Sequence, residues 1–198
     1  MRGRYNEQLA LTLLKKHFAE YQGLELSDKP DLIDEQNSIG VEVTRAINST
    51  VEEREAYFSK HMKNRRKNEF TTKQIENVEQ CGLGIVCENS IDEADDEKML
   101  GLVRVFGIEE YEQLHCAIRN KHAKKYVELD RIDLYIYFRQ VCPSGLSDFE
   151  INKIFQTVYE CEKKYGQVFS KIMIDFHSVL KILDLKNKSV KEINDYGE

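Results

Sequence analysis

The clearest alternation of hydrophobic and polar residues lies in the stretch from Lys29 to Ala46. Two short apolar runs, Leu32-Ile33 and Ile39 to Thr44, flank the polar segment Glu35 to Ser38, whose length and composition are typical of a β-hairpin loop. Because side chains alternate between the two faces of a strand, one face of the second run is apolar and the other is mixed. The apolar set is Ile39, Val41 and Val43, and the mixed set is Gly40, Glu42 and Thr44.

The register of this hairpin follows by counting back from a four-residue loop. Leu32 then faces Val41, and Asp31 faces Glu42. Directly opposed residues have Cβ atoms roughly 4.5 to 5.5 Å apart, and like charges there are destabilising. A divalent cation would offset this repulsion, since Mg²⁺ binds one or two carboxylates and retains several waters. The alternative is that Asp31 ends a turn and Glu42 is a solvated strand residue.

The remaining pattern predicts helices and strands in alternation. Tyr5 to Tyr21 reads as an amphipathic helix, in which Glu7 is either a first-turn residue favoured by the helix dipole or a third member of the acidic cluster. A tail that frays after Asn187 is expected. Further helices are predicted over 51–80, 109–127 and 148–165. Strands are predicted over 132–138 and 168–176, and the second of these either extends over 178–185 or forms a small hairpin with it. The segments 24–26 and 82–87 are read as either strand or loop.

This order predicts an α/β fold with a mixed β-sheet flanked by helices. We expect a single domain over residues 1–198, interrupted by a mainly helical insertion over 49–108. The segment 88–97 is expected to be an acidic loop, and Cys142-Pro143-Ser144-Gly145 a turn.

Composition narrows the choice of function. The net charge of -6 argues against a protein that coats nucleic acid, but it allows a local basic groove. The five cysteines are scattered without metal-ligand spacing, so free thiols in a reducing compartment are expected and a zinc site is disfavoured. No apolar run approaches the ~18 residues that span a bilayer. With no apolar signal core near Met1, a cytoplasmic protein without a membrane partner is expected.

Three features in order carry a resemblance to a known family. Glu7 lies in the first helix, Pro30-Asp31 enters a strand, and Glu42-Val43-Thr44 lies within an apolar strand about ten residues later. This arrangement resembles the PD-(D/E)xK nuclease superfamily, which has the restriction-endonuclease-like fold. The segment Arg2 to Glu7, followed by an amphipathic helix, is similar to the start of its Holliday-junction resolvase and Mrr-type branches.

The resemblance implies a metal-dependent hydrolysis of phosphodiester bonds. Asp31 and Glu42 would ligate Mg²⁺ or Mn²⁺ with the Val43 carbonyl, and Glu7 would bind the metal or its water. The sequence departs from the family pattern at Thr44, where the family has lysine, and a hydroxyl cannot supply that positive charge. Some members of the superfamily move this lysine to a neighbouring helix. The candidates here are Lys121, Lys124 and Lys125, with Lys60 and Lys63 as second choices.

The leading hypothesis is therefore a nuclease acting on DNA or RNA, in restriction, repair or defence, with Lys121 in the catalytic set. The alternative is an inactive nuclease-fold module that binds nucleic acid, and a third option is an α/β domain whose acidic residues are solvated. DNA is the expected partner, and a homodimer is one expected assembly because many enzymes that cut duplex DNA are symmetric dimers. The candidate nucleic-acid contacts are Arg2, Arg4, Lys63, Arg65 and Arg66.

Overall fold

A computed structural model describes residues 4–46, 49–79, 83–88, 97–104, 109–138, 146–194 and 196. The chain forms two compact units, which we call the main unit (Met1–Ala46 and Tyr111–Glu198) and the inserted unit (Ile47–Glu110). The expected insertion over 49–108 falls within the second of these. No helix among the described residues is both long and apolar enough to cross a bilayer.

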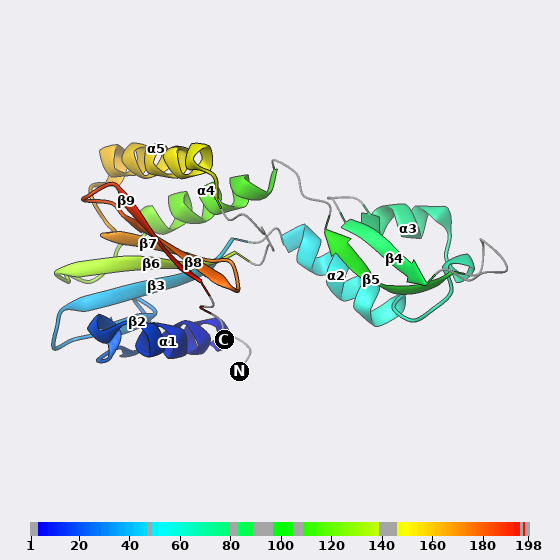
Figure 1. Cartoon of the computed structure of the whole chain (residues 1–198), viewed down its shortest axis with the longest axis horizontal. Coiled ribbons are helices and arrows are strands. Elements are labelled where there is room, and N and C mark those ends of the chain that lie inside the picture. The colour runs from blue at the N-terminus through cyan, green and yellow to red at the C-terminus, as the bar shows by residue number, and fades with distance from the viewer. Residues whose placement is uncertain are drawn as a thin grey trace. The chain divides into compact units, whose positions relative to one another are not determined.

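The main unit contains a seven-stranded mixed sheet in the order β1-β2-β3-β6-β7-β8-β9 (Figure 1). The three central strands β3, β6 and β7 run parallel, and every other neighbouring pair is antiparallel. The strands are β1 (Glu25–Leu26), β2 (Leu32–Asp34), β3 (Ile39–Arg45), β6 (Arg131–Tyr137), β7 (Lys171–Asp175), β8 (Val179–Asp184) and β9 (Ser189–Asn194).

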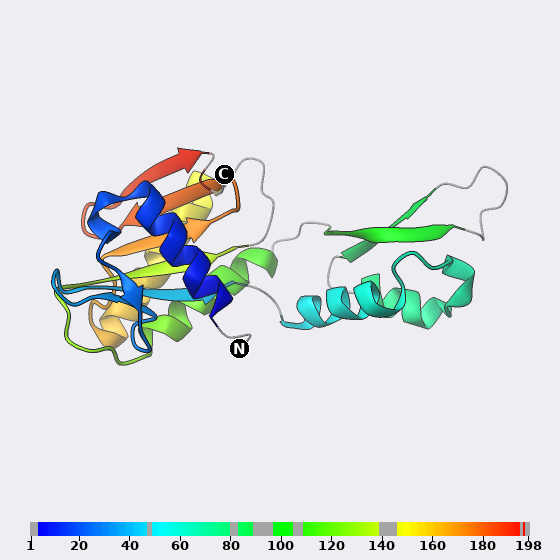
Figure 2. The same ribbon diagram turned by 90° about the horizontal axis from the view of Figure 1, so that it is seen from below.

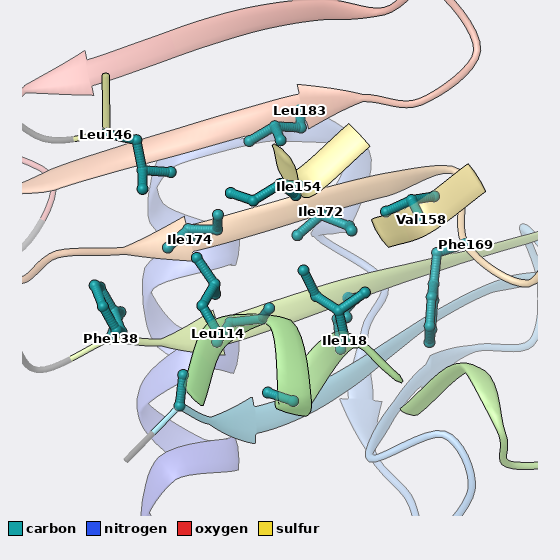
Figure 3. Close-up of a cluster of buried hydrophobic side chains, with 14 of the residues drawn as sticks. Leu114, Ile118, Phe138, Leu146, Ile154, Val158, Phe169, Ile172, Ile174 and Leu183 are labelled. Carbon is teal, nitrogen blue, oxygen red and sulfur yellow. The ribbon is translucent and has the colours of Figure 1, made fainter. Parts of the chain in front are cut away.

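Helices cover both faces of this sheet, so the main unit has three layers. One face carries α1 (Tyr5–His17), which crosses the strands in Figure 2. The other carries α4 (Glu109–His122) and α5 (Asp148–Tyr165). Each interface is a separate apolar core, as expected where a sheet is buried on both sides. Figure 3 shows the α4/α5 core, in which Leu114 and Ile118 pack with Ile154 against Ile172 and Ile174.

The sequence defines the ends of α5 clearly. Ser147 is the N-cap, and its side chain and that of Glu150 satisfy one another's backbone N–H groups in a capping box. At the other end Gly166 has a φ of 83°, a conformation that favours glycine and ends the helix. The helix predicted from Ser147 or Asp148 to Tyr165 is confirmed.

The inserted unit combines helices with a small sheet. It contains α2 (Ser49–His61), a 3-10 turn (Lys67–Glu69), α3 (Thr72–Glu79) and an antiparallel pair of strands, β4 (Leu83–Glu88) and β5 (Lys98–Arg104). Its own apolar core is formed by Phe58, Met62, Val78 and Met99. The strand alternative for 82–87 is confirmed by β4, whereas β5 was not predicted.

Several expectations need correction. The fraying expected after Asn187 is wrong for residues 189–194, which form β9 and pair with β8. The helix predicted over Tyr5 to Tyr21 ends at His17 as α1, and the helix predicted over 109–127 ends at His122 as α4, so both are shorter than predicted.

Other expectations are confirmed. The strand alternative for 24–26 is confirmed by β1, and the hairpin alternative for 178–185 is confirmed by β8, which pairs back on β7. The turn at 142–145 and residues 89–96 of the acidic loop lie outside the described residues.

Candidate active site

The hairpin of β2 and β3 has the register predicted by counting. Leu32 pairs with Val41, Ile33 with Gly40 and Asp34 with Ile39. Asp31 immediately precedes β2, and its Oδ2 accepts a hydrogen bond of 2.8 Å from the backbone N–H of Val43 on β3. This bond fixes the Asp31 carboxylate beside the Glu42-Val43 segment.

Glu42 is a buried carboxylate, only 2 % exposed. Strand alternation places it on the opposite face from Val41 and Val43, which belong to the α1 core. The reading of Glu42 as a solvated strand residue is therefore wrong. A buried carboxylate needs charged or hydrogen-bonding partners, and α4 and the segment after it supply them.

Two lysines converge on Glu42 from the end of α4. The Lys121 ammonium donates to Glu42 Oε1 and, over 3.0 Å, to the backbone carbonyl of Val43. The Lys124 ammonium lies 3.2 Å from the same Oε1. The Lys121 side chain is 13 % exposed and that of Lys124 is 53 % exposed, while Lys125 is an exposed residue. Two of the three sequence candidates for the displaced lysine thus reach the carboxylate.

The end of α4 is held firmly against the sheet. His122 is buried, donates from Nδ1 to the Ile118 carbonyl over 2.9 Å, and packs edge-on against Phe169 with ring centroids 4.8 Å apart. Beyond the helix, the hydroxyl of Tyr126 donates to the Lys121 carbonyl over 3.0 Å. These contacts orient Lys121 without using its ammonium.

Glu7 lies close enough to the acidic pair to interact with it electrostatically. Burial raises the pKa of Glu7, and the negative charges of Asp31 and Glu42 raise it further, against the lowering effects of Arg4 and Lys121. One of its oxygens, Oε2, is buried without a hydrogen-bond partner. These observations favour Glu7 as a neighbour of the acidic cluster over a residue that serves only the helix dipole.

Burial and neighbouring charges together shift the pKa of three other groups beside Glu42. Burial raises the pKa of Asp31; the Val43 N–H bond opposes this and the Glu42 charge adds to it. Burial also raises the pKa of Tyr126, and Glu42 and Asp31 contribute. For Lys124, burial lowers the pKa but the hydrogen bond and charge of Glu42 outweigh it, so the net shift is upward.

The donor set of this cluster fits a hard divalent cation. It consists of the carboxylates of Asp31 and Glu42 and the carbonyl of Val43, and oxygen donors of this kind suit Mg²⁺ or Mn²⁺. The orphaned Oε2 of Glu7 is a further oxygen without a partner. Among the described residues no three His, Cys, Asp or Glu side chains form a ready-made cage. The donor set is therefore compatible with a site of two carboxylates, one carbonyl and water.

The other predicted residues are distributed over both units. Thr44 is half-buried, two residues beyond Glu42 on β3, and Arg4 forms an ion pair with Asp28. Arg2 lies outside the described residues. The other three nucleic-acid candidates belong to the inserted unit; Lys63 is exposed, Arg65 pairs with Glu69 at 2.6 Å and lies over the Phe70 ring, and Arg66 begins the 3-10 turn.

Sequence reasoning missed two contributors to this site. Tyr126 positions Lys121, and Gly40 allows Pro30 and Leu129 to approach β3, since a Cβ at residue 40 would lie 2.4 Å from Pro30 Cγ. The sequence contained a signal for this role of Gly40, because a glycine inside a strand often marks a place where another part of the chain packs closely against the strand backbone.

Comparison with models of protein families, with curated proteins and with solved structures found no match to this chain.

Proposed function

We propose that this protein is a metal-dependent nuclease that hydrolyses phosphodiester bonds, with DNA as the first substrate to test. The observation that carries the proposal is the position of Lys121, whose ammonium contacts Glu42 and the Val43 carbonyl. It supplies from α4 the positive charge that Thr44 lacks. A carboxylate pair with an adjacent lysine is the set of groups that the resemblance to the PD-(D/E)xK superfamily implies for this reaction.

The order of elements supports a restriction-endonuclease-like core within the main unit. A first helix bearing Glu7 precedes the β2–β3 hairpin, and β3 continues into a parallel array with β6 and β7. Helices on both faces complete the three layers. The inserted unit interrupts this core between β3 and α4.

Each residue of the cluster has a role in the proposed reaction. Asp31, Glu42 and the Val43 carbonyl would hold the cation, and Glu7 would hold one of its waters. A bound Mg²⁺ or Mn²⁺ supplies a Lewis acid and lowers the pKa of the attacking water. Lys121 stabilises the negative charge that develops on the phosphate oxygens, and Lys124, being more exposed, approaches the substrate backbone.

Cleavage assays with neutral isosteres test the proposal. Purified protein is incubated with duplex, branched and single-stranded DNA and with RNA, each in Mg²⁺, Mn²⁺ or chelator. We expect metal-dependent cleavage that falls at least ~100-fold in Asp31→Asn and in Glu42→Gln, because each removes a charged ligand. Glu128→Gln is the matched control, since Glu128 is an exposed carboxylate on the segment between α4 and β6.

Wild-type protein that cleaves none of these nucleic acids in either metal would contradict the proposal. Salt-sensitive binding in chelator without any turnover in metal would instead favour the inactive binding module.

A further inference from the structure

The ammonium of Lys121 lies on the donors that a cation would use. It contacts Glu42 Oε1 and, at 3.0 Å, the Val43 carbonyl oxygen. Lys124 is 3.2 Å from the same Glu42 oxygen, so that oxygen already accepts two ammonium groups. The cation-free site is thus neutralised by the protein's own side chains.

A dication and the Lys121 ammonium compete for these donors. Both need the lone pairs of the same two oxygens, and their like charges repel strongly in a site where Glu42 is 2 % exposed. Lys124 is less constrained, because its side chain is 53 % exposed. Lys121 contacts both shared donors and is therefore the group that we expect a cation to displace.

We propose that Lys121 and a divalent cation bind Glu42 and the Val43 carbonyl in exchange for one another. This inference rests on the proposed function and specifies how the site is regulated: metal loading releases the Lys121 ammonium, which then becomes available to an anionic phosphate. The release costs part of the metal's binding free energy. The wild-type protein consequently binds metal more weakly than a protein without the Lys121 charge.

Calorimetric titration of the substrate-free, full-length protein with Mn²⁺ measures this exchange. We expect Lys121→Met, which keeps an apolar stem of similar length, to bind Mn²⁺ about tenfold or more tightly than wild type. Lys125→Met removes a nearby exposed lysine and should leave the dissociation constant unchanged. Equal or weaker binding by Lys121→Met would overturn the proposal.

Lysine labelling of the wild-type protein gives a readout that does not depend on the folding of a variant. Reductive methylation followed by peptide mass spectrometry should show low modification of Lys121 in chelator and a rise as Mn²⁺ saturates the site, with Lys125 modified equally in both. Modification of Lys121 that stays constant or falls with Mn²⁺ would overturn the exchange.

Failure of the exchange and failure of the nuclease activity give different results. If wild type binds Mn²⁺ and cleaves DNA but Lys121→Met binds no tighter, the exchange is wrong and the nuclease proposal stands. If neither wild type nor Lys121→Met binds Mn²⁺ and wild type cleaves nothing, both are wrong.

Discussion

At the scale of single residues, the site is defined by a buried carboxylate with two lysine partners. Breaking a buried ion pair by removing one partner is costly, whereas a neutral isostere limits the damage. The buried Glu42 carboxylate would not lose all its partners in a Lys121 variant, because the Lys124 ammonium lies 3.2 Å from Glu42 Oε1. Substitutions at Lys121 are therefore expected to reveal its role in chemistry more than its role in folding.

The first residue-scale prediction concerns the displaced lysine. Lys121→Met should lower turnover roughly 10²- to 10³-fold, the range for loss of one transition-state charge contact, even though it binds metal more tightly. Adding Thr44→Lys to this variant should restore part of the activity, because residue 44 lies two positions after Glu42 on β3, where the nuclease superfamily that the sequence resembles has a lysine. Steady-state cleavage rates at saturating Mn²⁺ measure the effect. A double variant no more active than Lys121→Met would refute the equivalence of the two positions.

A second residue-scale prediction follows from the raised pKa of Asp31. A carboxyl whose pKa is higher in the folded than in the unfolded state contributes stability that is fully present below the unfolded value and lost as pH rises through the folded one. At pH 7 the ionised, partly buried Asp31 is therefore a net cost. Asp31→Asn should raise the melting temperature in chelator at pH 7, and the gain should vanish below the ordinary Asp pKa of 3.8.

The Asn variant is suited to this measurement because its amide oxygen can still accept the Val43 N–H bond. Thermal denaturation followed by circular dichroism at pH 7 and near pH 3.5 provides the comparison. A variant that melts below wild type at pH 7 would show that the Asp31 charge stabilises the fold.

At the scale of elements, the approach of Pro30 to β3 makes the hairpin sensitive to one added methyl group. A Cβ at Gly40 would lie 2.4 Å from Pro30 Cγ and 2.7 Å from Leu129 Cδ1, and a proline ring cannot rotate away. Gly40→Ala should therefore destabilise the protein by about 1 to 3 kcal/mol and lower cleavage, since Pro30 carries Asp31 with it. Gly101→Ala is the matched control, because a Cβ there meets nothing within 4 Å. Chemical denaturation of both variants tests this, and equal stability would contradict it.

The elements also show what could and could not be predicted from the sequence. The hairpin register and α5 followed from loop length and from a Ser–Glu capping box, which are local signals. β9 was missed because its residues are almost all exposed and polar, so only pairing with β8 defines it. β5 differs from β9, because Met99, Leu100, Leu102 and Val103 are apolar; these residues are a strand signal in the sequence, and the structure pairs them with β4.

The choice among the three lysines depended on where α4 ends. A helix continuing to Val127 would place Lys125 one turn beyond Lys121 on the same face. Instead α4 ends at His122, and the backbone N–H of Lys124 bonds back to the Lys121 carbonyl over 3.2 Å. This tighter turn directs Lys124 toward Glu42 and leaves Lys125 exposed. Packing against Phe169 and the Tyr126 bond stabilise that end, and neither is visible in the sequence pattern.

At the scale of the whole molecule, the candidate active site around Glu42 belongs to the main unit, whereas the candidate nucleic-acid contacts Lys63, Arg65 and Arg66 belong to the inserted unit. The net charge of -6 means that affinity for nucleic acid must come from local cations. The inserted unit has its own core, and Lys60 and Lys63 are exposed near the end of α2. Such a unit can contribute substrate contacts without contributing to the chemistry.

The last prediction separates these contributions through salt dependence. For duplex DNA the logarithm of the binding constant falls with the logarithm of salt concentration by about 0.9 for each phosphate contact. The double variant Lys60→Gln, Lys63→Gln should therefore reduce the slope by about 2 and weaken binding uniformly across sequences. Fluorescence anisotropy in chelator at several salt concentrations measures the slope, and Lys73→Gln, another exposed lysine of the same unit, should leave it unchanged. An unchanged slope in the double variant would contradict a role for Lys60 and Lys63 in binding DNA.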